Sequence, residues 1–216
     1  MLRGRSACDG CGRTLRAAEL VPLLGWLVAR GRCRRCGGAI DPRHLAFELG
    51  CAAIGAVSGA VAQGWAGAFG AGFGWLLLTL AALDATELWL PDPLVLALAF
   101  LGLASAPFAP PPLVDRLVGG AAGFASLWAI GAGYARLRGR EGLGGGDPKL
   151  FGAIGLWLGW RALPIVLLLA ALVGLGLVLV QRLRGRALAA DTALPFGAFL
   201  AVAAYPAWIA VVGAAP

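Results

Sequence analysis

Charged residues are scarce in this chain: 13% of its 216 residues are Asp, Glu, Lys or Arg, whereas 60% are hydrophobic. Its mean hydropathy is +0.82. Such a composition excludes a soluble globule and a disordered chain. The sequence has one histidine and one lysine, no serine or cysteine nucleophile accompanied by a base, no phosphate-binding loop, and no signal-peptide pattern after its first residues. Nucleophilic hydrolases and nucleotide-binding enzymes are therefore not indicated.

Long uncharged runs make up most of the sequence. The run between Glu48 and Asp84 is interrupted at residues 63–65, which predicts two membrane helices and a tight turn. Further uncharged runs cover residues 93–114, 117–135, 162–181 and 192–216, and a shorter one covers 150–160. Because about 20 apolar residues cross a bilayer as a helix, we predict an all-α, polytopic membrane bundle of about seven spans. Frequent glycine within the runs favours close helix packing in lipid.

The distribution of arginine predicts the topology. Nine of the 17 arginines lie within residues 1–43, and two clusters follow the fourth and sixth predicted spans: Arg136, Arg138 and Arg140, then Arg182, Arg184 and Arg186. With seven spans, 16 of the 18 basic residues fall on one side, leaving only Arg116 and Arg161 on the other. The positive-inside rule makes the first side cytoplasmic. The positive charge thus reflects orientation in a lipid bilayer, and no nucleic-acid partner is expected.

Residues 1–43 form a separate polar module, followed by a membrane domain at 44–216. The module holds two cysteine pairs with CxxC spacing, 21 residues apart: Cys8, Cys11, Cys33 and Cys36. Two such loops can present four thiolates tetrahedrally to one zinc ion, and a closed site of this kind is structural. A thioredoxin-like redox pair would not account for two pairs, and disulfides are disfavoured in a reducing cytoplasm. The apolar stretch from Leu20 to Val28 is too short to cross a bilayer, so it either packs on the module or lies at the membrane interface.

Two aspartates are candidates for chemistry. Asp84 ends the second predicted span in ALDATELWLPDP, and Asp147 lies in the glycine-rich segment GLGGGDPKL, two residues before the only lysine. Charges in membrane helices are costly and are seldom kept without a role. The topology places both carboxylates on one side, where they could share a proton as the pair of an aspartic protease does. Alternatively, Asp84 reaches interfacial water, and Asp147, like Asp92, caps a helix ahead of a proline.

Four blocks of the sequence resemble the type IV prepilin peptidases, membrane aspartic proteases with a GxGD signature. The blocks are GRCRRCGGAIDPRHLAFEL, ALDATELWLPDPLVL, GLGGGDPKLFGAIGLWLGW and LPFGAFLAVAA, in the family's order. The resemblance implies that Asp84 and Asp147 are the catalytic pair and that the four cysteines are metal ligands. It also implies a bacterial inner-membrane protein that cleaves basic leaders from prepilins or pseudopilins, with S-adenosylmethionine as the methyl donor of a second activity. Glu87, Asp92 and Glu141 are the carboxylates expected nearest the pair, where a basic leader would bind.

The chain departs from the family pattern near its start. The family usually has a further membrane helix before the cysteines, whereas the first cysteine here is residue 8, and His44-Leu45 replaces the usual Tyr-Pro. The methylation is implied less strongly, because the preceding segment is implicated in it. Three other functions compete: a GxGD intramembrane protease of other specificity, a non-catalytic zinc-bearing assembly factor, and a transporter with Asp84 as a proton relay. A transporter is expected to carry such carboxylates near mid-membrane, often in repeated halves, and no repeat is found.

Overall fold

The computed structural model describes residues 6–185 and 193–214. Within these ranges the chain is helical, and its only β structure is two isolated bridges. The chain divides into two compact units, residues 1–53 and 54–216. This division falls inside one helix, α2 (Pro42–Val61), so that helix contributes to both units. Arg186, which belongs to the second predicted arginine cluster, lies outside the described residues.

The first unit is built from turns. It contains the short helices η1 (Ala17–Leu20) and α1 (Leu24–Ala29). Each cysteine pair lies in a loop that an antiparallel bridge closes, between Ala7 and Thr14 in one case and between Arg32 and Ala39 in the other. Cys33 is the only buried side chain among the described residues of this unit. The unit therefore has no hydrophobic core of its own.

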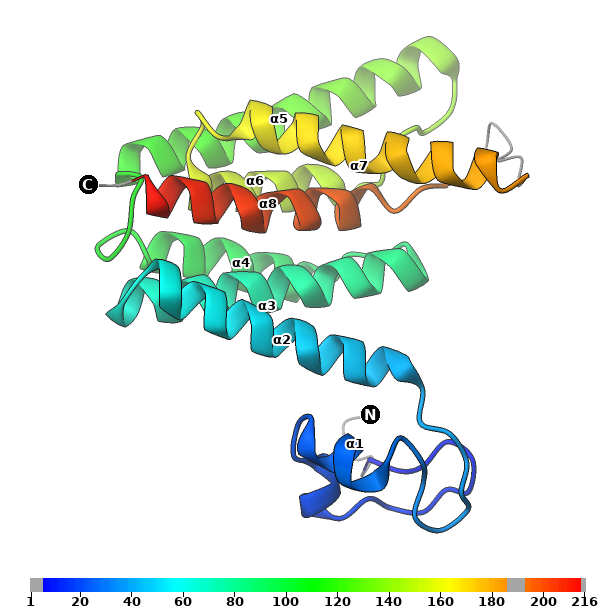
Figure 1. Cartoon of the computed structure of the whole chain (residues 1–216). Coiled ribbons are helices and arrows are strands. Elements are labelled where there is room, and N and C mark those ends of the chain that lie inside the picture. The colour runs from blue at the N-terminus through cyan, green and yellow to red at the C-terminus, as the bar shows by residue number, and fades with distance from the viewer. Residues whose placement is uncertain (1–5, 186–192, 215–216) are drawn as a thin grey trace. The chain divides into compact units, whose positions relative to one another are not determined.

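The second unit is a bundle of long apolar helices (Figure 1). After α2 the helices are α3 (Gly64–Glu87), α4 (Asp92–Ala104), α5 (Leu113–Arg138), α6 (Asp147–Leu158), α7 (Leu163–Leu183) and α8 (Phe196–Gly213). All seven predicted segments thus form helices, and the turn predicted at residues 63–65 separates α2 from α3. Five of them, α2, α3, α5, α7 and α8, are long and apolar enough to cross a membrane. The all-α, multi-pass membrane fold is confirmed.

The run at residues 93–114 is not one long helix, contrary to the prediction. α4 ends at Ala104, and α5 begins only after Pro112. The intervening segment contains Pro107 and three consecutive prolines, 110–112, which cannot donate helical hydrogen bonds. Arg116, which the span count predicts on the non-cytoplasmic side, is buried and donates to the backbone carbonyls of Gly102, Ala109 and Pro111 at 2.6–2.8 Å. This arginine fastens the end of α4 and the proline segment to α5.

α6 occupies the centre of the bundle. It packs against α4, α5 and α8, and ten of its 12 residues are buried. Its contact with α5 is made backbone to backbone: a Cβ on Gly119 would lie 2.5 Å from the carbonyl oxygen of Gly155, and one on Gly123 would lie 2.7 Å from that of Phe151. The close glycine packing predicted from sequence is therefore present. This contact sets the position of the N-terminus of α6, where Asp147 lies.

Candidate active site and metal centre

Asp84 lies in the last turn of α3. The helix ends at Glu87, and Leu88 takes the left-handed conformation (φ 51°) with its N–H bonded to the Asp84 carbonyl at 3.0 Å. The chain therefore turns sharply directly after the aspartate. The Asp84 side chain is buried rather than extended into solvent, with only 6% of the residue exposed. The interpretation of Asp84 as a residue that simply reaches water does not fit this position.

Asp147 is the first residue of α6 and is 5% exposed. Its Oδ2 accepts a hydrogen bond of 3.1 Å from the Gly144 N–H, within the glycine-rich loop before the helix. Two glycines of this loop are required by close approach: a Cβ on Gly142 would lie 2.5 Å from the Tyr134 ring, and one on Gly146 would lie 2.9 Å from Leu90. The loop thus folds tightly over the pocket because it carries no side chains at these points.

Neither Asp147 nor Asp92 caps a helix, contrary to the alternative considered from sequence. The N-cap positions are Gly146 and Pro91, and neither helix start has a side-chain cap hydrogen bond. Asp92 instead pairs with Lys149, with 2.8 Å between Oδ1 and Nζ. The ion pair joins the start of α4 to the start of α6. It therefore links α6, which begins with Asp147, to α4, the helix that follows Asp84 and α3 in the chain.

The N-terminus of α8 forms the third part of the site. The Ala198 N–H donates to Asp84 Oδ2 at 2.7 Å. A Cβ on the neighbouring Gly197 would lie 3.0 Å from Asp84 Oδ2, 3.1 Å from Asp147 Oδ1 and 2.8 Å from Leu90 Cδ1. Both carboxylates thus flank the same point of the α8 backbone. The segment LPFGAFLAVAA belongs to the family resemblance, but no residue in it was predicted to contribute to the site; the available signal was the glycine at the start of an apolar helix.

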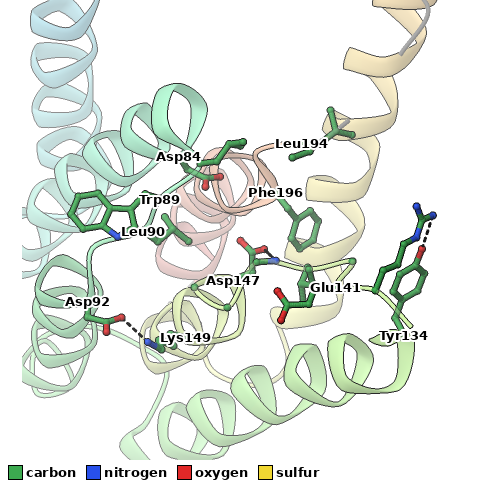
Figure 2. Close-up of a pocket in the computed structure, with 18 of the residues that line it drawn as sticks. Asp84, Trp89, Leu90, Asp92, Tyr134, Glu141, Asp147, Lys149, Leu194 and Phe196 are labelled. Atoms are coloured by element: carbon green, nitrogen blue, oxygen red, sulfur yellow. Dashed lines mark hydrogen bonds and ion pairs between the residues drawn. The ribbon is translucent and has the colours of Figure 1, made fainter. Parts of the chain in front are cut away.

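The two carboxylates open into one pocket of about 1110 Å³ (Figure 2). Its walls come from the end of α3, the turn before α4, the glycine-rich loop and the segment that precedes α8. Of the three further carboxylates expected near the pair, Asp92 and Glu141 line this pocket, whereas Glu87 does not. Asp92 is engaged by Lys149, while Glu141 forms no hydrogen bond or ion pair with any described residue. Two buried, adjacent carboxylates in a pocket of this size can act as a base and an acid on one bound group.

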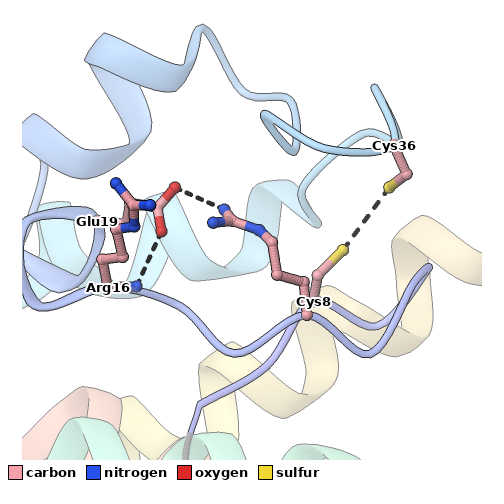
Figure 3. A network of polar contacts seen from close by, with 5 residues as sticks. Cys8, Arg16, Glu19 and Cys36 are labelled. Atoms are coloured by element: carbon pink, nitrogen blue, oxygen red, sulfur yellow. Dashed lines mark hydrogen bonds and ion pairs between the residues drawn. The ribbon is translucent and has the colours of Figure 1, made fainter.

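The four cysteines of the first unit come together as predicted. Their Sγ atoms all lie within 4.8 Å of one another, and those of Cys8 and Cys36 are 3.9 Å apart (Figure 3). Thiolates around a tetrahedral ion with bonds of about 2.3 Å would lie about 3.8 Å apart, so the cluster fits such an ion. Backbone N–H groups of Cys36 and Arg35 lower the pKa of Cys33 to about 6, which favours its thiolate. The donor set is thus suited to a soft metal ion.

Polar contacts brace the cysteine loops. Glu19 accepts from Arg13 at 2.6 Å and from the Arg16 N–H at 2.8 Å, which ties η1 to the first loop (Figure 3). The Glu48 carboxylate accepts a hydrogen bond of 2.7 Å from the Leu23 N–H. It thereby orients the start of α1. The fifth cysteine, Cys51, is half-buried in α2, apart from the four-cysteine cluster.

Comparison with known proteins identifies the family. Residues 71–179 match the type IV leader peptidase family, and residues 1–61 match the bacterial peptidase A24 N-terminal domain. The curated proteins named prepilin leader peptidase/N-methyltransferase include similar chains from Aeromonas hydrophila, Burkholderia pseudomallei and Pseudomonas aeruginosa. The first is 40% identical, covering 96% of this chain and 71% of the relative; the second is 45% identical, covering 91% and 64%. The third is 39% identical, covering 95% and 70%.

No solved structure matches the chain. The two family matches together extend over the four-cysteine unit and over both aspartates. A membrane-embedded helical bundle with a peptidase signature is thus the class to which the fold and the site point. The chain belongs to the type IV leader peptidase family.

Proposed function

We propose that this chain is a membrane aspartic endopeptidase that removes the basic leader from type IV prepilins or pseudopilins. The observation that carries the proposal is the convergence of Asp84 and Asp147 on Gly197 inside one large pocket. Names of the relatives, prepilin leader peptidase/N-methyltransferase, supply the substrate class. The substrate would present its apolar helix to the lipid-facing bundle and its leader to the pocket.

Asp84 is the base of the pair in this proposal. It accepts the 2.7 Å bond from Ala198 at the N-terminus of α8, where the helix dipole and the free N–H groups stabilise a carboxylate. Asp147 accepts a longer bond, 3.1 Å, and lies next to this negative charge, which favours its protonated form. The backbone N–H groups around the two carboxyl groups thus favour the ionised form of Asp84 and leave the proton on Asp147.

The proton transfers follow from these roles. Asp84 takes a proton from a water molecule as the water oxygen attacks the peptide carbonyl carbon, and Asp147 gives its proton to the carbonyl oxygen. The tetrahedral intermediate then collapses: Asp147 recovers the proton, the C–N bond breaks, and Asp84 gives its proton to the leaving amine. Both carboxyl groups end in their starting states. No metal takes part in these steps.

Glu141 is the proposed acceptor of the basic leader. It lines the pocket without an ionic partner, whereas Asp92 is already paired with Lys149. Glu87 does not line the pocket, so the structure favours Glu141 over Glu87 among the candidates. Replacing Glu141 by lysine should weaken substrate binding more at low than at high salt, because exposed charges are screened.

The four-cysteine site is proposed to hold one zinc ion. Cys8, Cys11, Cys33 and Cys36 would fill all four positions of a tetrahedral ion and leave none open, so the ion would have a structural role only. Methylation of the new N-terminus from S-adenosylmethionine is proposed from the names of the relatives alone. The described residues show no set of side chains that marks a site for this methyl donor.

Both aspartates are proposed to lie at the cytoplasmic face of the bacterial inner membrane, with the cysteine unit in the cytoplasm. Arginine asymmetry supports this orientation. Cysteines introduced at Ala85 and Gly145, with Cys51 replaced and the metal site filled, should react with an impermeant reagent only from the cytoplasmic side. Reaction of both from the periplasmic side alone would reverse the topology.

The experiment for the activity uses purified protein in lipid vesicles and a peptide with a basic leader ending in glycine, followed by an apolar helix. Mass spectrometry should find cleavage directly after the leader. Cleavage within the apolar helix would instead assign the chain to the intramembrane proteases of other specificity. An absence of products from a zinc-loaded, folded protein would contradict the peptidase proposal.

A further inference from the structure

The first unit carries an apolar surface that none of the unit's own described residues covers. It consists of five aliphatic side chains on η1, α1 and their connection, each between 43% and 65% exposed: Leu20, Val21, Leu24, Leu27 and Val28. We call these residues the α1 surface. Leu24, Leu27 and Val28 stand at positions i, i+3 and i+4 and so share one face of the helix.

The other side of α1 faces its own unit. Trp26 packs on Gly31, where a Cβ would lie 2.8 Å from the indole ring. The exposed leucines are therefore not turned inward to form a core, and the first of the two roles predicted for residues 20–28, packing on the module, does not account for them. A contiguous exposed apolar patch on a small unit marks an interaction surface.

The depth of α1 relative to the bilayer follows from its link to α2. The Leu23 N–H, directly before α1, donates to Glu48 Oε2 at 2.7 Å. Glu48 is six residues after Pro42, the first residue of α2, and therefore about 9 Å along that helix. This hydrogen bond holds the start of α1 beside the first two turns of α2, and α2 is a candidate membrane span. A bilayer that surrounds α2 has its headgroup region at this level.

The charges next to the α1 surface match the same partner. Arg16 directly precedes η1, Arg30 directly follows α1, and both are exposed. An amphipathic segment with flanking arginines is typical of helices that lie in the interface of anionic membranes. The flanking arginines, the apolar side chains and the position of α1 beside the start of α2 therefore all point to the same partner, the headgroup region of the bilayer.

We propose that the α1 surface inserts into the headgroup region of the bilayer and holds the cysteine unit against the membrane. The partner is the lipid surface itself, with a preference for anionic phospholipids. α1 acts here as a second attachment, beside the covalent one through α2. The proposal does not depend on the peptidase activity, and its test measures none.

Fluorescence quenching by spin-labelled lipids tests the proposal in the full-length, metal-loaded protein. Cys51 is replaced by alanine, Leu27→Cys is labelled with an environment-sensitive dye, and the protein is placed in nanodiscs containing phosphatidylglycerol. Thr14→Cys, an exposed position in the first cysteine loop, is the matched control. The Cys51→Ala parent without an added cysteine should incorporate no dye, because its other four thiols hold the metal.

The dye at position 27 should be quenched at least twofold more by a spin label near the headgroups than by one at the chain ends, and the dye at position 14 by neither. Less phosphatidylglycerol, or Arg16→Glu together with Arg30→Glu, should reduce the quenching at 27. Equal quenching at both sites, or none at 27, would overturn the proposal. Shielding of the dye at 27 without lipid quenching would show a protein occupant, such as a second copy.

Discussion

The two units of this chain differ in the interactions that stabilise each of them internally. Among the described residues of the first unit only Cys33 is buried, and four thiols meet at one point. The second unit buries a continuous set of apolar side chains around α6, including Phe73, Leu80 and Trp157, and brings α5 and α6 together through glycine. A unit without a core would depend on the proposed metal ion for its stability, whereas a helical bundle in lipid depends on close, complementary packing.

The same contrast separates the proposed roles. The cysteine site has all four donor positions in one polar unit, and none of its residues lines the pocket of Asp84 and Asp147. The pocket is built entirely from helix ends and loops of the bundle. We therefore expect that a change at the four-cysteine site leaves the pocket intact, and that a change in the pocket leaves metal binding intact.

Metal removal should have the largest effect and should be confined to the first unit. Structural zinc sites contribute about 10 to 16 kcal/mol to folding, and this unit has no core to compensate for the loss. Hydrogen exchange after chelation, or in a Cys33→Ser, Cys36→Ser variant, should show loss of protection in residues 6–40 and unchanged protection in α3 and α6. A folded, protected first unit without bound metal would contradict the prediction.

A methyl group on Gly197 should disrupt the pocket without touching the metal site. Gly197→Ala places Cβ 3.0 Å and 3.1 Å from the two carboxylates, so at least one of them must shift. Cleavage should fall by roughly 100-fold, or about 3 kcal/mol of transition-state stabilisation, with zinc content unchanged. Gly176→Ala, where nothing lies within 4 Å of the new Cβ, is the matched control. Normal activity of the Gly197 variant would remove α8 from the proposed site.

The glycine contact between α5 and α6 should be sensitive to a single methyl group. A Cβ on Gly155 would collide with the carbonyl of Gly119, so Gly155→Ala should destabilise the bundle by about 2 kcal/mol. Gly133→Ala, on the open face of α5, should be neutral. Thermal unfolding in detergent compares the two variants. Equal unfolding temperatures would show that this contact does not hold α6 in place.

The Asp92–Lys149 ion pair should matter least. Both side chains are about half exposed, 60% and 48%, and exposed pairs contribute at most about 1 kcal/mol. Lys149→Met and Asp92→Asn should each lower cleavage less than fivefold. A loss comparable to that of Gly197→Ala would mean that the pair positions the catalytic loops or meets the substrate.

Uncharged runs predicted the helices well because lipid permits little else over such lengths. The proline-rich end of the 93–114 run was the exception, since its uncharged residues conceal a break that prolines impose. The CxxC spacing predicted the thiol cluster, because each short loop already brings two thiols close together and the two loops only have to meet at one metal site. The number of spans between Asp84 and Asp147 predicted that both lie on the same side of the membrane.

Contacts through the backbone could not be predicted in the same way. The bond from Ala198 to Asp84 joins residues 114 positions apart and depends on where α8 begins, not on a side-chain type. The pairing of Asp92 with Lys149 likewise depends on the relative positions of α4 and α6. Counting spans predicted a side of the membrane for Arg116 but not its burial or its carbonyl partners, which depend on how the proline segment folds back on α5.

The most direct test of the account is cleavage of a prepilin-like peptide in lipid by Asp84→Asn and Asp147→Asn, with zinc content and thermal unfolding measured on the same samples. An amide cannot accept or give the proton that each role requires, so each variant should lose cleavage by at least about 1000-fold. Each should retain wild-type metal content and a folded bundle, and Asp92→Asn should stay active. Near-normal cleavage by either of the first two variants would contradict the aspartate mechanism.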